Sequence, residues 1–299
     1  MRSRPRVLVV YKKDAYQQYI QEQQDPHLGR LLRRGDPDVL DMRRAHTVHE
    51  EAMEAIVHAL RRLSVEFELA YRVGLKVRKR YHLVVSVGGD GTFLQAARSV
   101  RDTPILGVNS DPSRSEAVFC AATCRTFPRL CGQALEGRLP ELRLYRLQVS
   151  LNGKQLQQRA LNDVLVVHDD PSTMSRYRLR IGKREELQKS SGLWISTAAG
   201  SSSAVLAAGG VRLPWSSKRF QYRPRELYRG RLSRYRLIGG VLSPRSAVRV
   251  TWLMRRGSTF IDGPHVKIPL GFADRLDIRL SLGDPLRVLG LRENRRPPA

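Results

Sequence analysis

Residues Val84–Gln95 read VVSVGGDGTFLQ, and this stretch joins two different patterns of apolar residues. The apolar run His82–Val87 ends at the glycine-rich string Gly88–Thr92. A helical pattern begins directly after it, and its apolar positions are Phe93, Leu94, Ala97 and Val100. We therefore expect a buried strand, a glycine turn and a helix, in this order.

The glycine turn has the composition of a phosphate-binding site. Glycines adopt positive φ and let a ligand approach the backbone, and the first N–H groups of a helix bind anions. Asp90 is unusual at such a place, because a carboxylate repels phosphate. We interpret it as a group that holds a metal or takes a proton from a hydroxyl attacking a phosphoryl group. The alternative is an ordinary turn with an aspartate helix cap, but the full five-residue string favours phosphate chemistry.

Gly88–Thr92 (GGDGT) resembles the signature of the NAD kinases and of their relatives, the diacylglycerol and sphingosine kinases. It is not a Walker A loop, because no Gly-Lys-Ser/Thr follows, and it does not match the GxGxxG fingerprint. Further segments resemble the NAD kinase pattern in the same order: Gly107–Pro112, Ala160–Val164, Lys189–Ser201 and Phe260–Gly263. The pieces NSDPSRSE and QKSSGL look most like the mitochondrial-type branch, in a compact form.

In the NAD kinases the aspartate of the glycine motif is taken as the proton acceptor, so the resemblance implies that Asp90 is catalytic. It would activate the 2′-hydroxyl of the adenosine ribose of NAD for attack on the γ-phosphate of ATP. The implied phosphate-binding residues for ATP are Gly88, Gly89, Gly91 and Thr92. Mg²⁺ or another divalent cation would bridge phosphate oxygens, with no direct metal ligand expected from the protein. The implied NAD-binding residues are Asp90, Gly91, Asn162, Asp163, Lys189, Ser202, Ser203, Ala204 and Ala207, with Asn109 and Asp262 as further candidates.

Three of these segments have ordinary structural interpretations when each is taken alone. Asn162-Asp163 is also typical of a turn or bulge, and Asp262-Gly263 of a plain hairpin turn. Ser196–Ser203 is also typical of a flexible loop, although the apolar strand before it favours a nucleotide loop. The sequence departs from the family pattern at Ala204 and Ala207, where NAD kinases usually have a tyrosine and a serine. We therefore expect altered contacts on the nicotinamide side of NAD.

The first 125 residues alternate strands with helices, which is the pattern of a parallel sheet. Besides the strand before the glycine turn, the expected strands are Arg6–Lys12, Val65–Tyr71 and Pro104–Val108. Ligands of such sheets bind at the carboxyl ends of the strands. Asp90 and Asn109 both follow such ends, so we expect them at the same edge of the sheet.

The helical segments between these strands carry several histidines. Residues 14–45 predict a helix and then a loop at Gly35–Pro37, and Thr47–Glu50 has the form of a capping box that begins a second helix. His46, His49 and His58 lie on or near this second helix. They do not form an HExxH motif, so we expect a solvated face rather than a metal site.

From about residue 126 onward the pattern becomes mostly antiparallel β. A helix is expected over Thr126–Gly137, and Asn152-Gly153 predicts a hairpin whose return strand is Arg159–Val167. Further strands are expected over Arg176–Ile181, Leu193–Thr197, Val248–Met254, Phe260–Ile261 and Leu276–Leu280. We therefore predict an α/β N-terminal domain with a parallel sheet (1–125) and a mostly antiparallel all-β C-terminal domain (126–283), as in the NAD kinases and diacylglycerol kinases. Residues 284–299 are expected to fray or to pack back on the first domain.

The amino-acid composition of the chain limits the kinds of molecule that it is expected to bind. The chain has 299 residues, with 53 Lys and Arg against 28 Asp and Glu, a net charge of +25. The basic residues are scattered, so we do not expect binding of nucleic acid, although Arg219–Arg236 is a weak basic stretch. No apolar run approaches the ~20 residues of a membrane span, no signal peptide is evident, and Cys120, Cys124 and Cys131 match no common zinc pattern. We expect a cytoplasmic protein without membrane contact, and, as in other NAD kinases, a homodimer or homotetramer that binds NAD and ATP.

Two other functions are compatible with the sequence. A lipid or other small-molecule kinase of the same superfamily would share the glycine motif, but such kinases usually lack an Asn-Asp pair like Asn162-Asp163. A degenerate NAD-binding protein without catalytic activity is the second alternative, because the loop residue at the usual tyrosine position is Ala204.

Overall fold

The computed structural model describes residues 4–77, 80–231 and 234–293. The chain divides into two compact units, Met1–Leu142 with Arg287–Ala299 (unit 1) and Arg143–Leu286 (unit 2). The sequence-based boundary after residue 125 differs from this division. Helix α4 (Phe127–Leu135) belongs to unit 1, because Phe127 and Cys131 are buried in the core of that unit.

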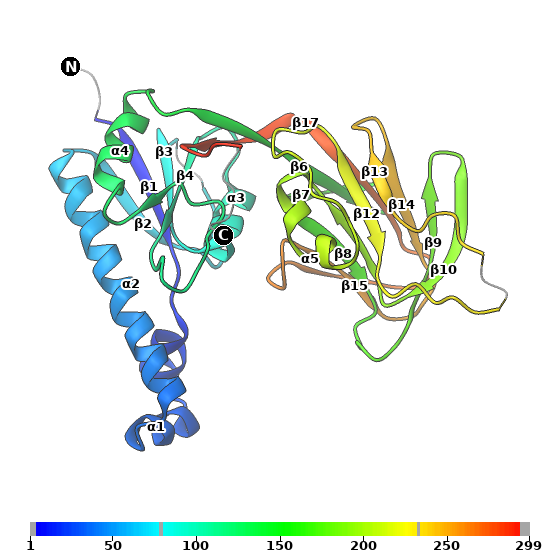
Figure 1. Ribbon diagram of the computed structural model, residues 1–299, viewed down its shortest axis with the longest axis horizontal. Coiled ribbons are helices and arrows are strands. Elements are labelled where there is room, and N and C mark those ends of the chain that lie inside the picture. Colours follow the sequence, from blue (N-terminus) through cyan, green and yellow to red (C-terminus); the bar gives the residue numbers. More distant parts are fainter. Residues whose placement is uncertain (1–3, 78–79, 232–233, 294–299) are drawn as a thin grey trace. The chain divides into compact units, whose positions relative to one another are not determined.

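Unit 1 is built on a parallel sheet, as predicted from the sequence. Its strands follow the order β2 (Glu66–Tyr71), β1 (Arg6–Tyr11), β3 (Leu83–Gly88) and β4 (Ile105–Asn109), and β5 (Ala122–Thr123) pairs with β4. All of these pairs are parallel. Helices α2 (Pro37–Arg62) and α4 lie on one face of this sheet and α3 (Asp90–Ser99) on the other (Figure 1).

The register of the parallel sheet brings the carboxyl ends of its strands to one edge. Tyr11 of β1 pairs with Tyr71 of β2 and with Val87 of β3, and Gly88 pairs with Asn109 of β4. The glycine turn and Asn109 therefore lie at the same edge, as the strand pattern predicted.

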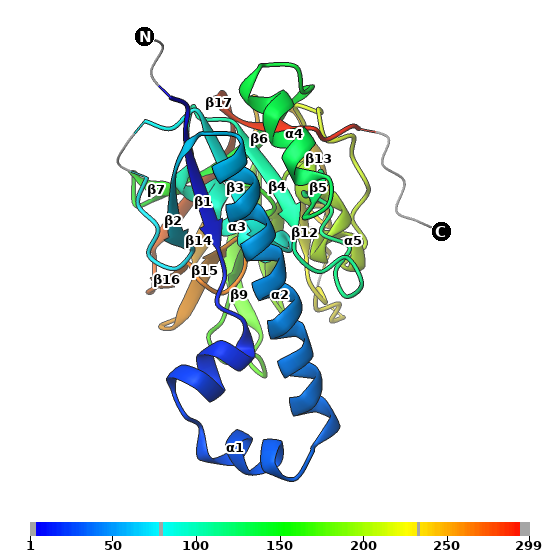
Figure 2. The ribbon, with the colours of Figure 1, turned by 90° about the vertical axis from the view of Figure 1, so that its left-hand side faces the viewer.

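Helix α2 begins earlier than the sequence suggested. Its N-cap is Asp36, whose carboxylate accepts the N–H groups of Asp38 and Val39, and Pro37 is its first residue. The chain reaches it through the π-helical segment η1 (Tyr16–Glu22) and α1 (Pro26–Arg33), and Figure 2 shows α2 as one continuous helix. The capping box predicted at Thr47 is wrong, because Thr47 lies inside the helix and donates to the Arg43 carbonyl at 3.3 Å.

Two of the three histidines of α2 are not on a solvated face, which corrects the prediction for His46 and His49. His46 and His49 are only 5% and 4% exposed, whereas His58 is exposed. The Nδ1 atom of His46 lies 2.8 Å from the Asp14 carboxylate, and the Nε2 atom of His49 lies 3.1 Å from the Lys12 carbonyl. Burial lowers the pKa of His49. Within the described ranges, no three His, Cys, Asp or Glu side chains are grouped so that they could hold a metal.

Unit 2 contains antiparallel strands in two layers around one apolar core. One set comprises β6 (Glu141–Leu151), β7 (Lys154–Ala160), β9 (Ser175–Ile181), β10 (Arg184–Ser190), β14 (Ala247–Trp252) and β17 (Arg275–Leu289). The other has the order β13 (Gly240–Leu242), β12 (Phe220–Pro224), β11 (Leu193–Ser196), β8 (Asp163–Val167), β15 (Gly257–Ile261) and β16 (Lys267–Leu270). Alternate residues of both sets form the core, among them Val164, Ile195, Val248 and Trp252. The predicted antiparallel β character of this part is confirmed.

The hairpin at Asn152-Gly153 is confirmed, with φ of 50° and 81° at its two turn residues. The predicted return strand Arg159–Val167 is wrong, because β7 ends at Ala160 and β8 begins at Asp163 in the other set of strands. This break lies at Leu161-Asn162 and creates the segment to which the candidate site belongs.

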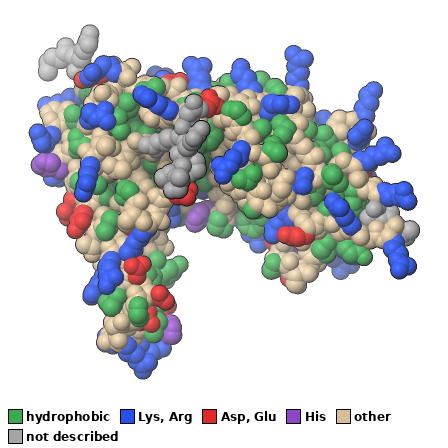
Figure 3. All heavy atoms as spheres, viewed as in Figure 1, with side chains coloured by type: hydrophobic (Ala, Val, Ile, Leu, Met, Phe, Trp, Pro, Cys, Tyr) green, Lys and Arg blue, Asp and Glu red, His purple; other side chains and the backbone are tan. Residues whose placement is uncertain are grey.

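The described part of the C-terminal segment from Arg287 to Glu293 packs back on unit 1, which is the second of the two expectations for it. Val288 of β17 pairs with Ile105 of β4, and Leu289 lies in the unit 1 core. The terminal Arg-Arg-Pro-Pro lies outside the described residues. None of the described helices is both long and apolar enough to cross a bilayer. On the face shown in Figure 3, lysine and arginine side chains are spread over both units.

Candidate active site

The glycine turn is shaped by contacts within unit 1. Gly88 has φ +150°, and a Cβ built on it would lie 2.5 Å from the Thr92 hydroxyl oxygen. A Cβ on Gly89 would lie 2.9 Å from the Ser115 hydroxyl oxygen. Gly91, in contrast, is exposed, and apart from its own helix backbone and chain neighbours, the nearest described atom to a built Cβ is Nη1 of Arg72, at 3.7 Å. Gly88 and Gly89 are therefore required by the turn itself, whereas Gly91 leaves open space over the backbone.

The Asp90 carboxylate is held by a distant loop and not by its own helix. Its Oδ2 accepts the Val118 N–H at 3.0 Å, and its Oδ1 accepts the Phe119 N–H at 2.9 Å. Gly89 is the N-cap of α3, without a side-chain cap, so the interpretation of Asp90 as a simple helix cap is wrong. A carboxylate has about four acceptor positions, so Asp90 keeps capacity for a ligand hydroxyl.

Burial raises the pKa of Asp90, and the nearby Glu116 carboxylate raises it further. The N–H groups of Phe119 and Val118 lower this pKa, but their effect is smaller than the effect of burial. A partly desolvated carboxylate with a raised pKa is a stronger proton acceptor than an exposed aspartate.

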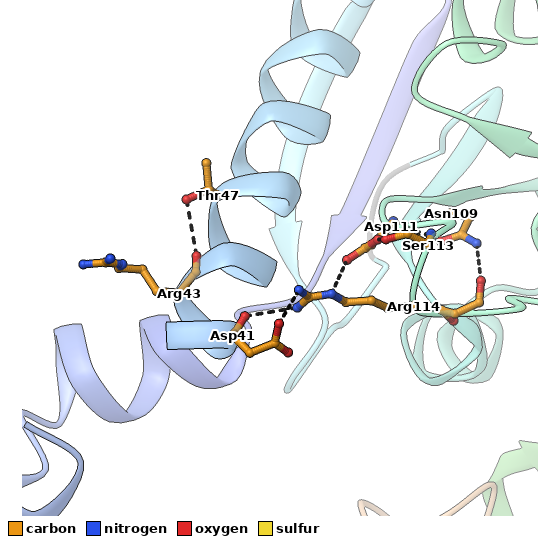
Figure 4. Close-up of polar contacts among 8 residues, drawn as sticks. Asp41, Arg43, Thr47, Asn109, Asp111, Ser113 and Arg114 are labelled. Carbon is orange, nitrogen blue, oxygen red and sulfur yellow. Dashed lines mark hydrogen bonds and ion pairs between the residues drawn. The ribbon is translucent and has the colours of Figure 1, made fainter. Parts of the chain in front are cut away.

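Asn109 organises the loop that supplies these two N–H groups. Its Oδ1 accepts the Asp111 N–H at 3.0 Å and its Nδ2 donates to the Ser115 carbonyl at 2.7 Å. Arg114 fixes the outer part of the loop to α2, because its Nη2 lies 2.7 Å from the Asp41 carboxylate (Figure 4). Asn109 is therefore placed to position the loop around Asp90.

In unit 2, Asn162-Asp163 lies at the break between β7 and β8 and is anchored by Asp262. The Asp262 carboxylate accepts three consecutive N–H groups, from Leu161 at 2.8 Å, Asn162 at 2.8 Å and Asp163 at 3.2 Å. Asp262 is in the β15–β16 turn with φ 49°, followed by Gly263 with φ 89°. The hairpin interpretation of Asp262-Gly263 is thus correct, and the same turn also fixes the Asn-Asp pair.

The two side chains of this pair differ in their surroundings. Asp163 is 7% exposed, and burial together with the Asp262 carboxylate raises its pKa to about 7, although the Ser203 hydroxyl at 3.2 Å acts against this. The buried Oδ1 atom of Asn162 has no hydrogen-bond partner among the described residues. An unpartnered amide beside a protonatable carboxyl is suited to the hydroxyl groups of a ribose.

The hydroxyl-rich segment is packed against this pair. A Cβ on Gly200 would lie 2.2 Å from the Asn162 carbonyl, and the Ser196 hydroxyl donates to the same carbonyl at 3.1 Å. Ser196–Ser203, which continues through the 3₁₀ segment η2 (Ala199–Ser202) into α5 (Ala204–Ala207), is therefore not a flexible loop. Ser202, Ala204 and Ala207 are exposed around it.

Sequence comparison decides the family. A family model for the ATP-NAD kinase N-terminal domain matches residues 40–121. A probable NADH kinase of Oryza sativa subsp. japonica is 35% identical over 256 residues, which cover 77% of this chain and 78% of the relative.

The chain belongs to the NAD kinase family.

Other NAD kinases support this assignment. An NADH kinase of Arabidopsis thaliana is 32% identical over 77% of this chain and 80% of the relative. Human mitochondrial NAD kinase 2 is 30% identical over 66% of this chain and 56% of the relative. Family membership identifies the chain as an ATP-dependent kinase that acts on NAD rather than on a lipid.

Solved NAD kinase structures share the fold. An NAD kinase from Archaeoglobus fulgidus in complex with ATP superposes with a TM-score of 0.67 at 22% identity, covering 98% of this chain and 95% of the other. Yeast NADH kinase complexed with NADH gives a TM-score of 0.68 at 16% identity, covering 98% and 85%. At these identities the likeness establishes the fold.

Within unit 2, one residue implied by the NAD kinase pattern lies apart from the Asn-Asp pair. Lys189 is near the end of β10, and its Nζ lies 4.7 Å from the centre of the Tyr228 ring. The next strand, β11, begins at Leu193 and pairs with β8. Asp163, the first residue of β8, is paired with Ser196, the last residue of β11. The structure therefore places Lys189 beyond the opposite end of β11 from the Asn-Asp pair.

The groups that orient Asp90 were not predicted from the sequence. The N–H donors of Val118 and Phe119 are backbone atoms of an irregular loop, so no side-chain pattern indicates them. Lys12 and Arg72, which follow β1 and β2 at the same edge of the NAD kinase sheet, were not predicted either. Their positions at the ends of predicted strands were a usable signal.

Proposed function

We propose that this NAD kinase phosphorylates the 2′-hydroxyl of the adenosine ribose of NAD, giving NADP and ADP, with Asp90 as general base. The observation that carries the proposal is the Asp90 carboxylate. It is partly buried, its pKa is raised, and two backbone N–H groups hold it beside the open backbone of Gly91.

The glycine turn is proposed to bind the phosphate groups of ATP. The N–H groups of Thr92 and Phe93 donate to the Gly89 carbonyl. The N–H groups of Asp90 and Gly91 precede them in the first turn of α3, where the helix offers them no acceptor and its dipole favours an anion. Gly91 presents no side chain there. Phosphate oxygens could therefore approach the backbone closely enough to accept these N–H groups.

A divalent cation, Mg²⁺ in the first instance, is proposed to accompany ATP. Mg²⁺ usually keeps several waters and needs only one or two carboxylates besides phosphate oxygens. Asp90 is the carboxylate of the glycine turn, so the donor set fits an ion carried mainly by the nucleotide. Such an ion would neutralise charge on the transferred phosphoryl group.

Asn162 and Asp163 are proposed to bind ribose hydroxyls. The Asn162 amide can both donate and accept, and Asp163 can accept when ionised or donate when protonated. Asp262 keeps the backbone of both residues in place. Ser203 contributes by its contact with Asp163, and Ser202, Ala204 and Ala207 form the exposed surface next to it.

The proposed step transfers the γ-phosphoryl group of ATP to the 2′-oxygen of the adenosine ribose. Asp90 takes the proton of the 2′-hydroxyl while this oxygen forms a bond to the γ-phosphorus, and the bond to the bridging oxygen of the β-phosphate breaks. ADP leaves with that oxygen, and the proton passes from Asp90 to solvent. Proton transfer of this kind contributes about 10²–10⁴-fold in rate, and the positioning of the two reactants supplies much of the rest.

NADH is a second candidate substrate. The relatives from Oryza sativa and Arabidopsis thaliana are both named NADH kinases. The exposed Ala204 offers no aromatic ring for stacking on a planar, charged nicotinamide. Comparing NAD with NADH as acceptor, at equal ATP, would establish which is preferred.

The test is incubation with ATP, Mg²⁺ and NAD, with NADP detected by an NADP-specific dehydrogenase and the position of the new phosphate by ³¹P NMR. Formation of NADP at the expected position supports the proposal. Absence of NADP, or transfer to dispersed diacylglycerol instead, would contradict it. Assembly as a homodimer or homotetramer and a cytoplasmic location also stay proposals, to be tested by light scattering and by cell fractionation.

A further inference from the structure

Two basic residues leave the unit 1 sheet at the same edge as the glycine turn. Lys12 directly follows β1 and Arg72 directly follows β2, and the preceding residues, Tyr11 and Tyr71, are paired in register. The Arg72 N–H donates to the Tyr11 carbonyl at 2.9 Å. Because Tyr11 also pairs with Val87, the residue before Gly88, both basic residues are next to the turn.

Arg72 touches the turn directly. Its Nη1 donates to the Thr92 hydroxyl oxygen at 3.0 Å and lies 3.7 Å from the position that a Cβ on Gly91 would occupy. Its Nε is buried without a hydrogen-bond partner in the described part of the chain. The guanidinium therefore borders the open space over Gly91 and still has donors to offer.

Lys12 carries a half-buried ammonium group. Burial lowers its pKa, and the Arg72 charge adds to this against the opposing effect of Asp14 and Asp111. No carboxylate of the residues that the structure describes forms an ion pair with Lys12 or Arg72. The neighbouring Lys13 differs, because its Nζ lies 2.7 Å from the Glu22 carboxylate and this contact raises its pKa.

The acidic groups nearest Lys12 already have other partners. Asp14 accepts the Gln17 N–H at 3.0 Å and lies 2.8 Å from Nδ1 of His46. Asp111 accepts the Ser113 hydroxyl at 2.6 Å and forms an ion pair with Arg114 at 3.6 Å (Figure 4). Two partly desolvated cations thus lie at the sheet edge that carries the glycine turn, and neither forms an ion pair with a described carboxylate. This arrangement is costly unless a ligand supplies the charge.

We propose that Lys12 and Arg72 form a cationic clamp that binds the phosphate chain of the ATP donor over Gly91. This inference rests on the proposed function and adds two binding residues to it. The planar guanidinium of Arg72 suits paired phosphate oxygens, and the ammonium of Lys12 acts as a mobile point charge. The pyrophosphate of NAD has the same chemistry, and separate measurements on the two substrates distinguish them.

The test compares Lys12→Met and Arg72→Gln with the matched control Lys13→Met. We expect each clamp variant to raise KM for ATP roughly ten- to hundredfold, as the loss of a charged hydrogen bond would, with KM for NAD within twofold of wild type. Lys13→Met should leave both constants unchanged, because Lys13 is already paired with Glu22.

A binding measurement without turnover uses inorganic tripolyphosphate as the probe. It should raise the thermal midpoint of the wild type and of Lys13→Met but not of Lys12→Met. Lys12→Met removes a charge without a partner, so it should fold, which NAD-induced stabilisation would verify. An unchanged KM for ATP, or a rise in KM for NAD alone, would overturn the clamp. The proposed function fails separately, if the wild type makes no NADP.

Discussion

The Oδ1 atom of Asp90 lies 2.9 Å from the backbone nitrogen of Phe119, and this contact joins the glycine turn to a loop that begins after the next strand. The Val118 N–H binds the second carboxylate oxygen at 3.0 Å. The orientation of the proposed base is therefore set by the conformation of residues 110–119. A residue whose buried contacts shape the inner part of this loop, such as Asn109, should therefore affect the rate of phosphoryl transfer.

Asn109→Ala tests this dependence. The variant loses the 2.7 Å bond to the Ser115 carbonyl and the 3.0 Å bond from the Asp111 N–H. We expect kcat to fall about tenfold or more, because a small misplacement of a reacting group is expensive. Arg114→Ala is the control, since its ion pair with Asp41 is at the surface and surface pairs contribute only ~0–1 kcal/mol. Equal losses in both variants would argue against a specific role for Asn109.

Gly91→Ala separates phosphate binding from stability. A methyl group there has no contact closer than 3.7 Å within the described chain, and alanine is favoured over glycine in a helix by up to ~1 kcal/mol. We expect an unchanged or higher thermal midpoint together with a KM for ATP raised at least tenfold, because the methyl occupies the phosphate position. Gly88→Ala should instead destabilise the protein through its contact with Thr92. A Gly91→Ala enzyme with normal KM for ATP would contradict the phosphate site.

Asp163→Asn tests the buried carboxyl through its pH dependence. Its pKa of about 7 in the folded protein lies above the ordinary 3.8. Between these values the folded state holds a proton that the unfolded state has lost. The free energy of unfolding should therefore fall as the pH rises from 4 to 7.

The asparagine variant should lack this contribution, so its stability relative to wild type should rise with pH, as urea unfolding at pH 5, 6, 7 and 8 would show. Asp170→Asn is a useful contrast, because the Ser172 hydroxyl and N–H hold the pKa of this exposed aspartate below its ordinary value. A difference between Asp163→Asn and wild type that does not change with pH would exclude a raised pKa.

Asp262→Ala tests the anchoring of the Asn-Asp pair. It removes the acceptor of three N–H groups, and each buried N–H left unsatisfied costs ~1–3 kcal/mol. We expect lower stability and a higher KM for NAD, with KM for ATP little changed. Asp274→Ala also removes a turn acceptor, here for the Gly271 N–H at 2.7 Å, and should destabilise the protein without raising KM for NAD. The same effect on KM in both variants would refute the anchoring role.

The sequence predicted those parts of the fold that have a strong local pattern. The strand, glycine turn and helix around Asp90, the parallel sheet and the Asn152-Gly153 hairpin all follow from apolar spacing and turn residues. The helix start at Asp36 was missed, because Thr47–Glu50 imitates a capping box in the middle of a continuous helix. Polar edge strands such as β10 (REELQKS) were missed, because much of their surface is exposed and they lack a clear apolar alternation.

The candidate residues were found through short motifs, but their supporting contacts were not. Asp262 was proposed as a candidate NAD-binding residue. In the structure its carboxylate accepts hydrogen bonds from the backbone N–H groups of Leu161–Asp163. The burial of His46 depends on Asp14, 32 residues earlier in the chain, so a helical pattern alone could not reveal it. Contacts between distant segments of the chain determine both features. Such contacts produce no recognisable pattern in the sequence around either residue.

The most direct test of the central claim is the kcat of Asp90→Asn, measured with saturating ATP, Mg²⁺ and NAD alongside the affinity of the variant for NAD. The amide nitrogen replaces one of the two accepting oxygens, so the thermal midpoint serves as the control for folding. We predict a fall in kcat of at least about 10²-fold with NAD binding retained. A folded variant that binds NAD and turns over at the wild-type rate would contradict the assignment of Asp90 as the base.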